Sequence, residues 1–187
     1  MRIVAGAWRG RSLKAPPGET TRPTADRVRQ ALFDMLLHAP WGGRGAIDGV
    51  RVLDGFAGTG ALGLEALSRG AANATFLERD VAALAVLRSN ITALRAQARC
   101  NVLTTDVLSA PPGAPCDLVF LDPPYGQDLV SRAVVHLARG GWIGPGALIV
   151  AETGHAEPLP SGEVLAAQLL GERQHGAARI SFWHANA

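Results

Sequence analysis

Apolar and polar residues alternate over residues 2–16, and Gly6 and Gly10 interrupt this alternation. A period of two that is broken by glycine predicts a β-hairpin, because successive side chains of a strand point to opposite faces and glycine permits the turn. From residue 28 onward the apolar positions recur with helical spacing instead. We expect a helix there, with Thr24 as its N-cap and Pro40 beyond its end.

Short apolar strands and amphipathic helices alternate along the rest of the chain. This order predicts an α/β fold, a doubly wound and mostly parallel sheet with helices on both faces. Uninterrupted apolar runs such as 118–121 fit strands that are buried on both faces. The tail beyond residue 163 contains one or two further strands, with a turn near Gly171 or Gly176. The expected strands are 50–56, 73–78, 100–106, 116–121 and 146–153, and the expected helices are 60–70, 80–97 and 129–142.

Acidic residues stand at the ends of several expected strands, namely Asp54, Glu78, Asp106 and Asp122. The ligands of parallel sheets bind beyond the carboxyl ends of the strands, near the point where the strand order reverses. We therefore expect these carboxylates to surround a binding site.

The residues after Asp54 contain the string G-x-G-x-x-G at Gly58, Gly60 and Gly63, which also occurs in dinucleotide-binding proteins. The glycines do not identify the ligand, and Gly63 equally suits close packing of a helix on a strand. A carboxylate directly ahead of the loop would repel a pyrophosphate, whereas it would attract a cation. S-adenosylmethionine carries an ammonium and a sulfonium beside an adenosine, so it fits this position better than NAD does.

Two further acids fit the rest of such a cofactor. Glu78, at the end of the second expected strand, can accept hydrogen bonds from both ribose hydroxyls. Asp106, after the third, can accept from the adenine amino group; a helix cap or surface turn is its alternative role.

Asp122 is followed by Pro123, Pro124 and Tyr125, directly after an apolar strand. Two prolines stiffen the turn, so that the carbonyl of Pro123 can point outward as a hydrogen-bond acceptor. That carbonyl and the Asp122 carboxylate would converge on a planar group with an exocyclic amine, while Tyr125 stacks on its face. Accepting both N–H groups would expose the nitrogen lone pair for attack on the methyl group. A plain proline turn at the end of a strand is the alternative.

The composition fits one soluble globular domain. The 187 residues are 48% hydrophobic and 18% charged, which is sufficient for a core of their own. Cys100 and Cys116 form no C-x-x-C pair, which argues against a disulfide framework and favours a reducing, cytoplasmic location. We see neither a signal-peptide core nor an apolar run of membrane-spanning length. The five histidines show no ligand spacing, so we expect no metal.

Positive charge is concentrated at the start of the chain. Residues 1–30 carry a net charge of +5, and the remainder carries −3. A basic segment on an acidic body indicates a polyanionic partner, most simply a nucleic acid. Arg9, Arg11, Arg22 and Arg27 are therefore candidates for phosphate contacts with RNA. Surface charge without a partner is the alternative, and for Arg22 and Arg27 an ion pair with a nearby aspartate.

These motifs resemble the class I S-adenosylmethionine-dependent methyltransferases, and in particular the bacterial 16S ribosomal RNA guanine-N2 methyltransferase family, RsmD. The likeness runs from Met1 to about Gly154 and is most specific in the basic arm and in residues 22–24. Phe56 departs from the family, which often has Leu or Cys there. The resemblance implies a seven-stranded, Rossmann-like methyltransferase sheet, with an N-terminal hairpin arm at 1–20 and the methyltransferase domain at 21–187.

The resemblance also implies the reaction, which is methylation of the N2 amine of one guanine in 16S ribosomal RNA, free or in a small-subunit particle. We expect a monomer. An adenine of DNA or a protein glutamine remains the alternative methyl acceptor. A non-catalytic NAD-binding module is an alternative function from a different functional class. The catalytic residues implied are Asp122, Pro123, Pro124 and Tyr125, and the cofactor-binding residues are Thr24, Asp54, Gly55, Phe56, Ala57, Gly58, Gly60, Glu78, Arg79, Asp106 and Asp122.

Overall fold

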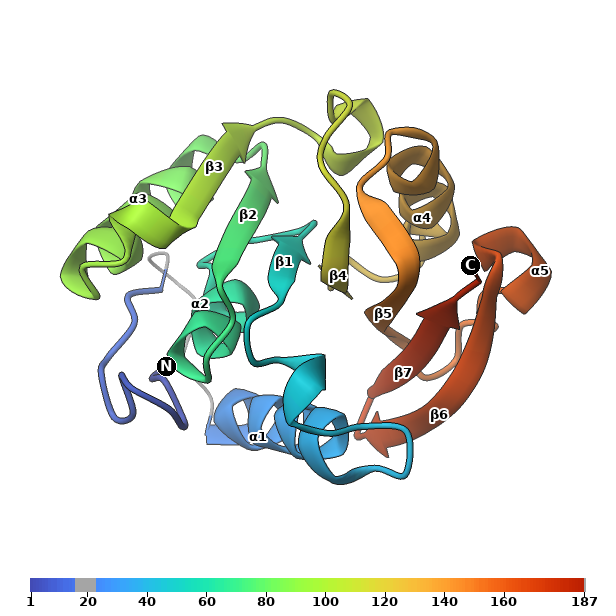
Figure 1. The fold of residues 1–187 in the computed structure, drawn as a ribbon, viewed down its shortest axis with the longest axis horizontal. Helices are drawn as coiled ribbons and strands as arrows, with labels where there is room; N and C mark the ends of the chain where they lie inside the picture. The colour runs from blue at the N-terminus through green and yellow to red at the C-terminus, as the bar shows by residue number, and fades with distance from the viewer. Residues whose placement is uncertain (16–22, 187) are drawn as a thin grey trace.

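The computed structural model describes residues 1–15 and 23–186, with the backbone alone for residues 23–25. One seven-stranded sheet runs through the molecule in the order β3-β2-β1-β4-β5-β7-β6 (Figure 1). Strands β1 to β5 run parallel to one another, whereas β7 is antiparallel to both β5 and β6, so the predicted mostly parallel sheet is confirmed. The strands are β1 Arg51–Asp54, β2 Asn73–Glu78, β3 Cys100–Thr104, β4 Cys116–Leu121, β5 Ile143–Gly154, β6 Ala167–His175 and β7 Ala178–Ala185.

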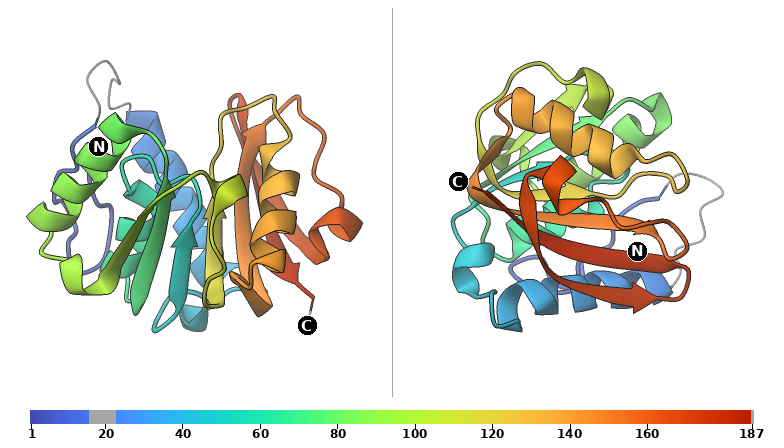
Figure 2. Two further views of the ribbon diagram at one scale, coloured as in Figure 1. Left: turned by 90° about the horizontal axis from the view of Figure 1, so that it is seen from above. Right: turned by 90° about the vertical axis from the view of Figure 1, so that its right-hand side faces the viewer.

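The two faces of the sheet carry separate hydrophobic cores. In β4, Leu118 and Phe120 belong to the core that α1, α2 and α3 cover, whereas Val119 and Leu121 belong to the core beneath α4. Continuous apolar strands are the result, because both faces of the sheet exclude water. The predicted helices on both faces are confirmed, as Figure 2 shows from two further sides. The α-helices are α1 Pro23–His38, α2 Ala61–Ser68, α3 Val81–Ala93, α4 Leu129–Arg139 and α5 Gly162–Leu165, and the short 3-10 helices are η1 Arg44–Ala46, η2 Gln97–Arg99 and η3 Val107–Ser109.

The tail forms two strands, which was one of the two predicted possibilities. Strand β6 ends at His175 and β7 begins at Ala178, so the turn lies at Gly176, where φ is +62°. Gly171 instead lies within β6, next to a shift in its register with β7.

The N-terminal arm, residues 1–15, differs from the predicted hairpin. A single antiparallel bridge joins Arg2 to Ser12, and no pair of strands forms among these residues. The reason lies in where the backbone groups of residues 4–8 bind. The N–H groups of Val4 and Ala5 donate to the carboxylate of Glu65 on α2, and the N–H of Trp8 donates to a serine at the end of that helix. The two sides of the arm still pair, because the N–H of Ile3 donates to the carbonyl of Arg11 at 2.9 Å and the N–H of Leu13 donates to that of Met1 at 3.0 Å. The arm is therefore a short, irregular hairpin fastened to α2 rather than a free-standing one.

The helix boundaries correct one detail of the sequence prediction. Helix α1 begins at Pro23, so Thr24 lies inside the helix and is not its N-cap. Proline is well suited to the first helical position, because its φ is preset and its missing N–H would have no partner there. Helix α3 begins as predicted, after Asp80, whose side chain accepts from the N–H of Ala83. In residues 1–15 and 23–186, no helix is long and apolar enough to span a bilayer.

Two glycines with the same backbone conformation test the contact between the arm and α2. Gly6 and Gly10 have φ values of +79° and +82°, so alanine strains both positions alike, by about 1–2 kcal/mol. A Cβ on Gly6 would lie 1.9 Å from the carbonyl oxygen of Ser68, whereas a Cβ on Gly10 would meet nothing within 4 Å. We expect Gly6→Ala to lower the thermal unfolding midpoint by several degrees more than Gly10→Ala, because the arm must move off α2. Equal shifts in calorimetry would contradict this.

Candidate active site

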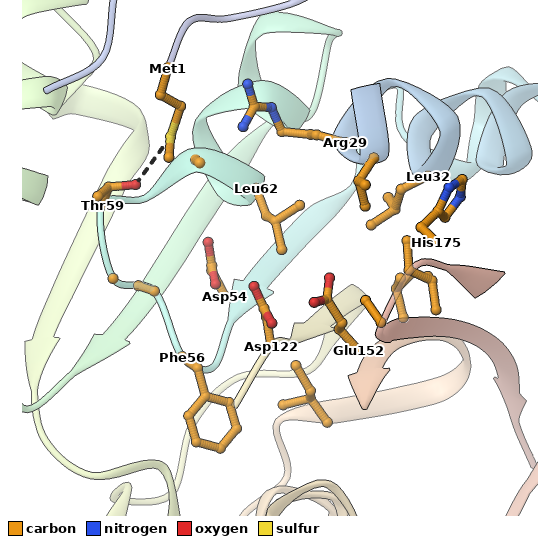
Figure 3. Close-up of a pocket in the computed structure, with 18 of the residues that line it drawn as sticks. Met1, Arg29, Leu32, Asp54, Phe56, Thr59, Leu62, Asp122, Glu152 and His175 are labelled. Atoms are coloured by element: carbon orange, nitrogen blue, oxygen red, sulfur yellow. Dashed lines mark hydrogen bonds between the residues drawn. The ribbon is translucent and has the colours of Figure 1, made fainter. Parts of the chain in front are cut away.

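Three carboxylates lie on one face of the sheet, at the carboxyl ends of adjacent strands. Residues two apart in a strand share a face, and the residues two before Asp54, Asp122 and Glu152 all belong to the core beneath α1 and α2. The register agrees, because β4 and β5 pair Leu121 with Ala151. Figure 3 shows the three side chains next to one another at the edge of one cavity.

This cavity has a volume of about 710 Å³ and lies where the strand order reverses, between β1 and β4. That is the position at which parallel sheets bind their ligands. It brings together six of the predicted site residues: Asp54, Phe56, Ala57, Gly58, Asp122 and Tyr125. Gly55, Gly60, Glu78, Arg79, Asp106, Pro123 and Pro124 do not line it. Thr24 has no described side chain, and its predicted cofactor contact lies outside the described residues.

Asp54 is the most deeply buried of the three carboxylates, with 2% of its surface exposed. Its Oδ2 accepts from the N–H of Gly63, in the first turn of α2, at 3.0 Å. Burial raises the pKa of Asp54 to about 7; the Gly63 hydrogen bond opposes the rise, and the charge of Glu78 adds to it. Holding this group ionised at neutral pH therefore calls for a positive charge nearby.

Two of the three glycines of the G-x-G-x-x-G string are explained by packing. A Cβ on Gly63 would lie 2.4 Å from the ring of Phe76 on β2, and a Cβ on Gly60 would lie 2.4 Å from the side chain of Leu87 on α3. Close packing of α2 on β2 favours glycine at position 63, and close contact with α3 together with a φ of +80° favours glycine at position 60. The string by itself is thus no evidence for a dinucleotide.

Glu78 holds the loop that follows β1. Its Oε2 accepts from the N–H of Gly58 at 2.7 Å, and its Oε1 accepts from the N–H groups of Arg79 and Asp80, each at 2.8 Å. These bonds fix the loop beneath the cavity. The predicted bonds from Glu78 to a ribose are untested and stay a prediction.

Asp106 follows β3 and lies outside the cavity. Its Oδ1 accepts from the N–H of Leu108 at 2.8 Å, and its Oδ2 forms an ion pair with Arg79. The Leu108 hydrogen bond and the Arg79 guanidinium hold the pKa of Asp106 below its usual range. The structure therefore shows the capping role, and the predicted contact with adenine stays a prediction for both Asp106 and Arg79.

The motif that starts at Asp122 forms one wall of the cavity. Asp122 can be reached by solvent through the opening, and Tyr125 is 45% exposed at its rim. Loss of solvation raises the pKa of Asp122, and the negative charges of Glu152 and Asp54 raise it further. Pro123 and Pro124 border a smaller, neighbouring cavity instead.

Glu152 and Glu157 are site residues that the sequence prediction missed. The Tyr125 hydroxyl donates to Oε1 of Glu152, and this bond, after burial, raises the pKa of Tyr125. Oε1 of Glu157 accepts from the N–H groups of Gly126, at 2.8 Å, and Gly154, at 3.1 Å, and so ties the loop after β4 to the end of β5. An acid after an apolar run was the available signal for Glu152, since the run 147–151 precedes it.

The predicted RNA-binding arginines do not gather at the cavity. Helices α2 and α3 begin near the carboxyl edge of the sheet and end near the opposite edge, where the turn of the arm lies (Figure 2). There Arg11 donates to the carbonyl of Ala93, at the end of α3, at 2.8 Å, and Arg9 is exposed. Arg27 is exposed on α1, and Arg22 lies outside the described residues. Phosphate contacts by these residues stay a prediction.

The cavity suits a cationic cofactor. Among the described residues, no Arg, Lys or His forms an ion pair with Asp54, Asp122 or Glu152. Arg29 also lines the cavity, but its guanidinium pairs with carboxylates outside it. The surplus of negative charge therefore fits the ammonium and sulfonium of S-adenosylmethionine. Residues 1–15 and 23–186 hold no cluster of three or more potential metal ligands.

Known proteins share this sequence and fold. The family model described as Conserved hypothetical protein 95 matches residues 1–184. A Haemophilus influenzae protein named Ribosomal RNA small subunit methyltransferase D is 42% identical over 164 residues, which cover 85% of this chain and 81% of that protein. A Bacillus subtilis protein named Putative rRNA methyltransferase YlbH is 36% identical over 165 residues, 86% of each chain. A solved structure, the putative methyltransferase yhhF from Escherichia coli, has a TM-score of 0.85 and 39% identity and covers 100% of this chain and 98% of its own.

The sheet and the acidic cavity at its carboxyl edge define a Rossmann-like methyltransferase, in agreement with these relatives. Within that class, the chain belongs to the RsmD family of methyltransferases.

Cation binding at Asp54 predicts a specific dependence on pH. The pKa of its carboxyl group is raised to about 7, so the group carries a proton below neutrality and must release it to bind a cation. We expect the affinity for S-adenosylmethionine to rise from about pH 6 to 8, by at most about tenfold per unit for each proton released. Calorimetry in two buffers of different ionisation enthalpy measures that proton. Asp54→Asn has no carboxyl group and so cannot release this proton. An unchanged pH dependence of the affinity in this variant would show that Asp54 is not the group that binds the cation.

Proposed function

We propose that this protein transfers the methyl group of S-adenosylmethionine to the exocyclic N2 amine of a guanine in 16S ribosomal RNA. The observation that carries the proposal is the position of Asp122 and Tyr125 in the same cavity as Asp54. A site for a cation and a site for an amine thereby share one space. Relatives named as small-subunit ribosomal RNA methyltransferases support the choice of RNA.

The cofactor end of the cavity is formed by the loop after β1. When bound, S-adenosylmethionine supplies a methyl group on a positively charged sulfur. Asp54 balances the positive charge of its methionine end, and the loop from Gly55 to Gly58, held by Glu78, provides backbone groups beside it. Gly60, which does not itself line the cavity, and Thr24 are proposed to contribute to cofactor binding at the same end. Glu78, with Asp106 and Arg79 beyond it, is proposed to meet the adenosine.

The acceptor end is formed by the motif after β4. The Asp122 carboxylate and the carbonyl of Pro123 accept the two N–H groups of the amine, and Pro124 keeps the turn rigid. The amine then points its lone pair at the methyl group, so that orientation supplies most of the rate. Methyl transfer leaves a positive nitrogen that must lose a proton. Asp122 can receive it, because the raised pKa of its carboxyl group favours the protonated form.

The target base has to leave its stack in the RNA to enter this cavity. Tyr125, 45% exposed at the rim, offers its ring as a stacking surface for the extruded guanine. Arg9 and Arg11 lie at the opposite edge of the sheet, so RNA that contacts them and the cavity must extend along the α2 and α3 side of the protein.

Removal of the Asp122 carboxylate tests the acceptor site. We expect Asp122→Ala to lower kcat/KM for transfer of a labelled methyl group to small-subunit RNA by at least about 100-fold, because one acceptor for the developing charge is lost. Affinity for the cofactor should change far less. Asp128→Ala is the matched control, since Asp128 lies on the same loop, is exposed and does not line the cavity.

Mapping of the methylated nucleotide decides the substrate. Mass analysis of ribosomal RNA from cells with and without the protein should show one guanine that loses an N2 methyl group. Label found in DNA or in protein instead of RNA, or full activity of the Asp122→Ala variant, would overturn the proposal.

The basic arm provides a second test. We expect Arg9→Glu to weaken binding of small-subunit RNA and to reduce the steepness of its salt dependence by at least about one phosphate contact, with cofactor affinity unchanged. Arg139→Glu, an exposed arginine at the end of α4, is the control. Filter binding over a range of salt concentrations measures both variants. Equal losses of RNA and cofactor affinity would show that Arg9 has a structural role only.

A further inference from the structure

Glu152 has no role in the reaction as described so far, yet it lies directly beside the acceptor site. Strands β4 and β5 are parallel and in register up to Leu121 and Ala151, so Asp122 and Glu152 are the next residues of the two strands. Both side chains face the same cavity, as Figure 3 shows. Neighbouring strands are about 4.8 Å apart, which places two carboxylates side by side where the base would lie.

The carboxylate of Glu152 keeps acceptor capacity that the protein does not use. Its Oε1 accepts from the Tyr125 hydroxyl, whereas the described residues supply no hydrogen bond or ion pair to its Oε2. An ionised carboxylate offers about four acceptor positions and no donor. Glu152 therefore favours a ligand that presents an N–H group at this place, next to the group that Asp122 holds.

The nucleobases differ in what lies beside their exocyclic amines. In guanine the ring nitrogen N1 carries a hydrogen next to the N2 amine, so the base presents adjacent donors to two adjacent carboxylates. In adenine and cytosine the ring nitrogen next to the amine is an acceptor, and it would face the Glu152 carboxylate with its lone pair. A bound base shields these groups from water, so a wrong hydrogen-bonding group at this place leaves both partners unpaired and is disfavoured.

We propose that Glu152 determines the specificity for guanine, by accepting the N1–H of the base while Asp122 accepts from its N2 amine. The inference rests on the proposed function and assigns the choice of base to one residue. Tyr125 has a supporting part, since its hydroxyl holds one oxygen of Glu152 and leaves the other for the base.

The test compares two bases that carry the same reactive amine. 2-Aminopurine has an exocyclic amine at C2 like guanine, but its N1 is an acceptor. Small-subunit RNA with either base at the mapped position is the substrate. We expect the wild-type protein to prefer guanine by at least about 100-fold in kcat/KM. Glu152→Gln keeps the size of the side chain and adds an N–H donor that suits the N1 of 2-aminopurine, so the preference should fall by at least about tenfold.

Two further variants separate recognition of the base from support of the loop. Tyr125→Phe removes the hydroxyl that orients Glu152 but leaves its carboxylate in place, so the preference for guanine should fall clearly less than in Glu152→Gln, whatever the rate. Glu152→Ala has neither donor nor acceptor at this place, so it should lower the preference for guanine without any gain in activity on 2-aminopurine. It replaces Glu152→Gln in the test if the glutamine variant does not fold.

Equal losses for both bases in the Glu152 variants, or the same fall of preference in Tyr125→Phe, would overturn the role of Glu152 while leaving guanine methylation intact. Absence of methylation of the guanine RNA by the wild-type protein would overturn the proposed function and this inference with it.

Discussion

The alternation of side chains along parallel strands forces Asp54, Asp122 and Glu152 onto one face of the sheet, at the edge where three strands end. Their negative charges share one cavity, and among the described residues no cation pairs with any of them. Burial raises the pKa values of Asp54 and Asp122, and for Asp122 the negative charges of Glu152 and Asp54 raise the pKa further. A cationic cofactor would offset the cost of ionising these groups, and N–H donors of a base would satisfy their oxygens, so the three carboxylates favour that pair of ligands.

Helix α2 contacts both Asp54 in this cavity and the N-terminal arm. Its first turn donates the N–H of Gly63 to Asp54, and its buried Glu65 accepts from the backbone of the arm and from Arg69 at 2.8 Å. Glu65 is fully buried, so loss of these donors would leave a carboxylate without compensation. The arm in turn buries Ile3 and Leu13 in the same core as α2. A single helix thus connects the cofactor site to the basic segment of the chain.

The sequence predicts most of this fold because most helices and strands are determined by the pattern of apolar and polar residues within them. The runs 73–78 and 116–121, in which apolar residues predominate, form β2 and β4 as expected. The alternation of the arm predicts a hairpin, and its ends do pair through backbone hydrogen bonds, but Val4 and Ala5 donate instead to a side chain of α2, about 60 residues away in the chain. Pairing over such a distance leaves no periodic signal. Glu152 was missed for a related reason, since its importance comes from the register of β4 with β5 and not from its neighbours in sequence.

Hydrogen-bond donors divide the acidic residues at the strand ends into two groups, which the sequence does not distinguish. Glu78 and Asp106 accept from backbone N–H groups or arginine with both oxygens, so the protein itself satisfies them. Asp54 and Glu152 each have one oxygen held by the protein, Oδ2 by the N–H of Gly63 and Oε1 by the Tyr125 hydroxyl. A carboxylate held by one oxygen is oriented and still has acceptors for a ligand, which is the condition for recognition at a fixed place. On the proposed function, Glu78 of the first group supports the loop that would hold the cofactor, whereas Asp54 and Glu152 of the second group would meet the cofactor and the base.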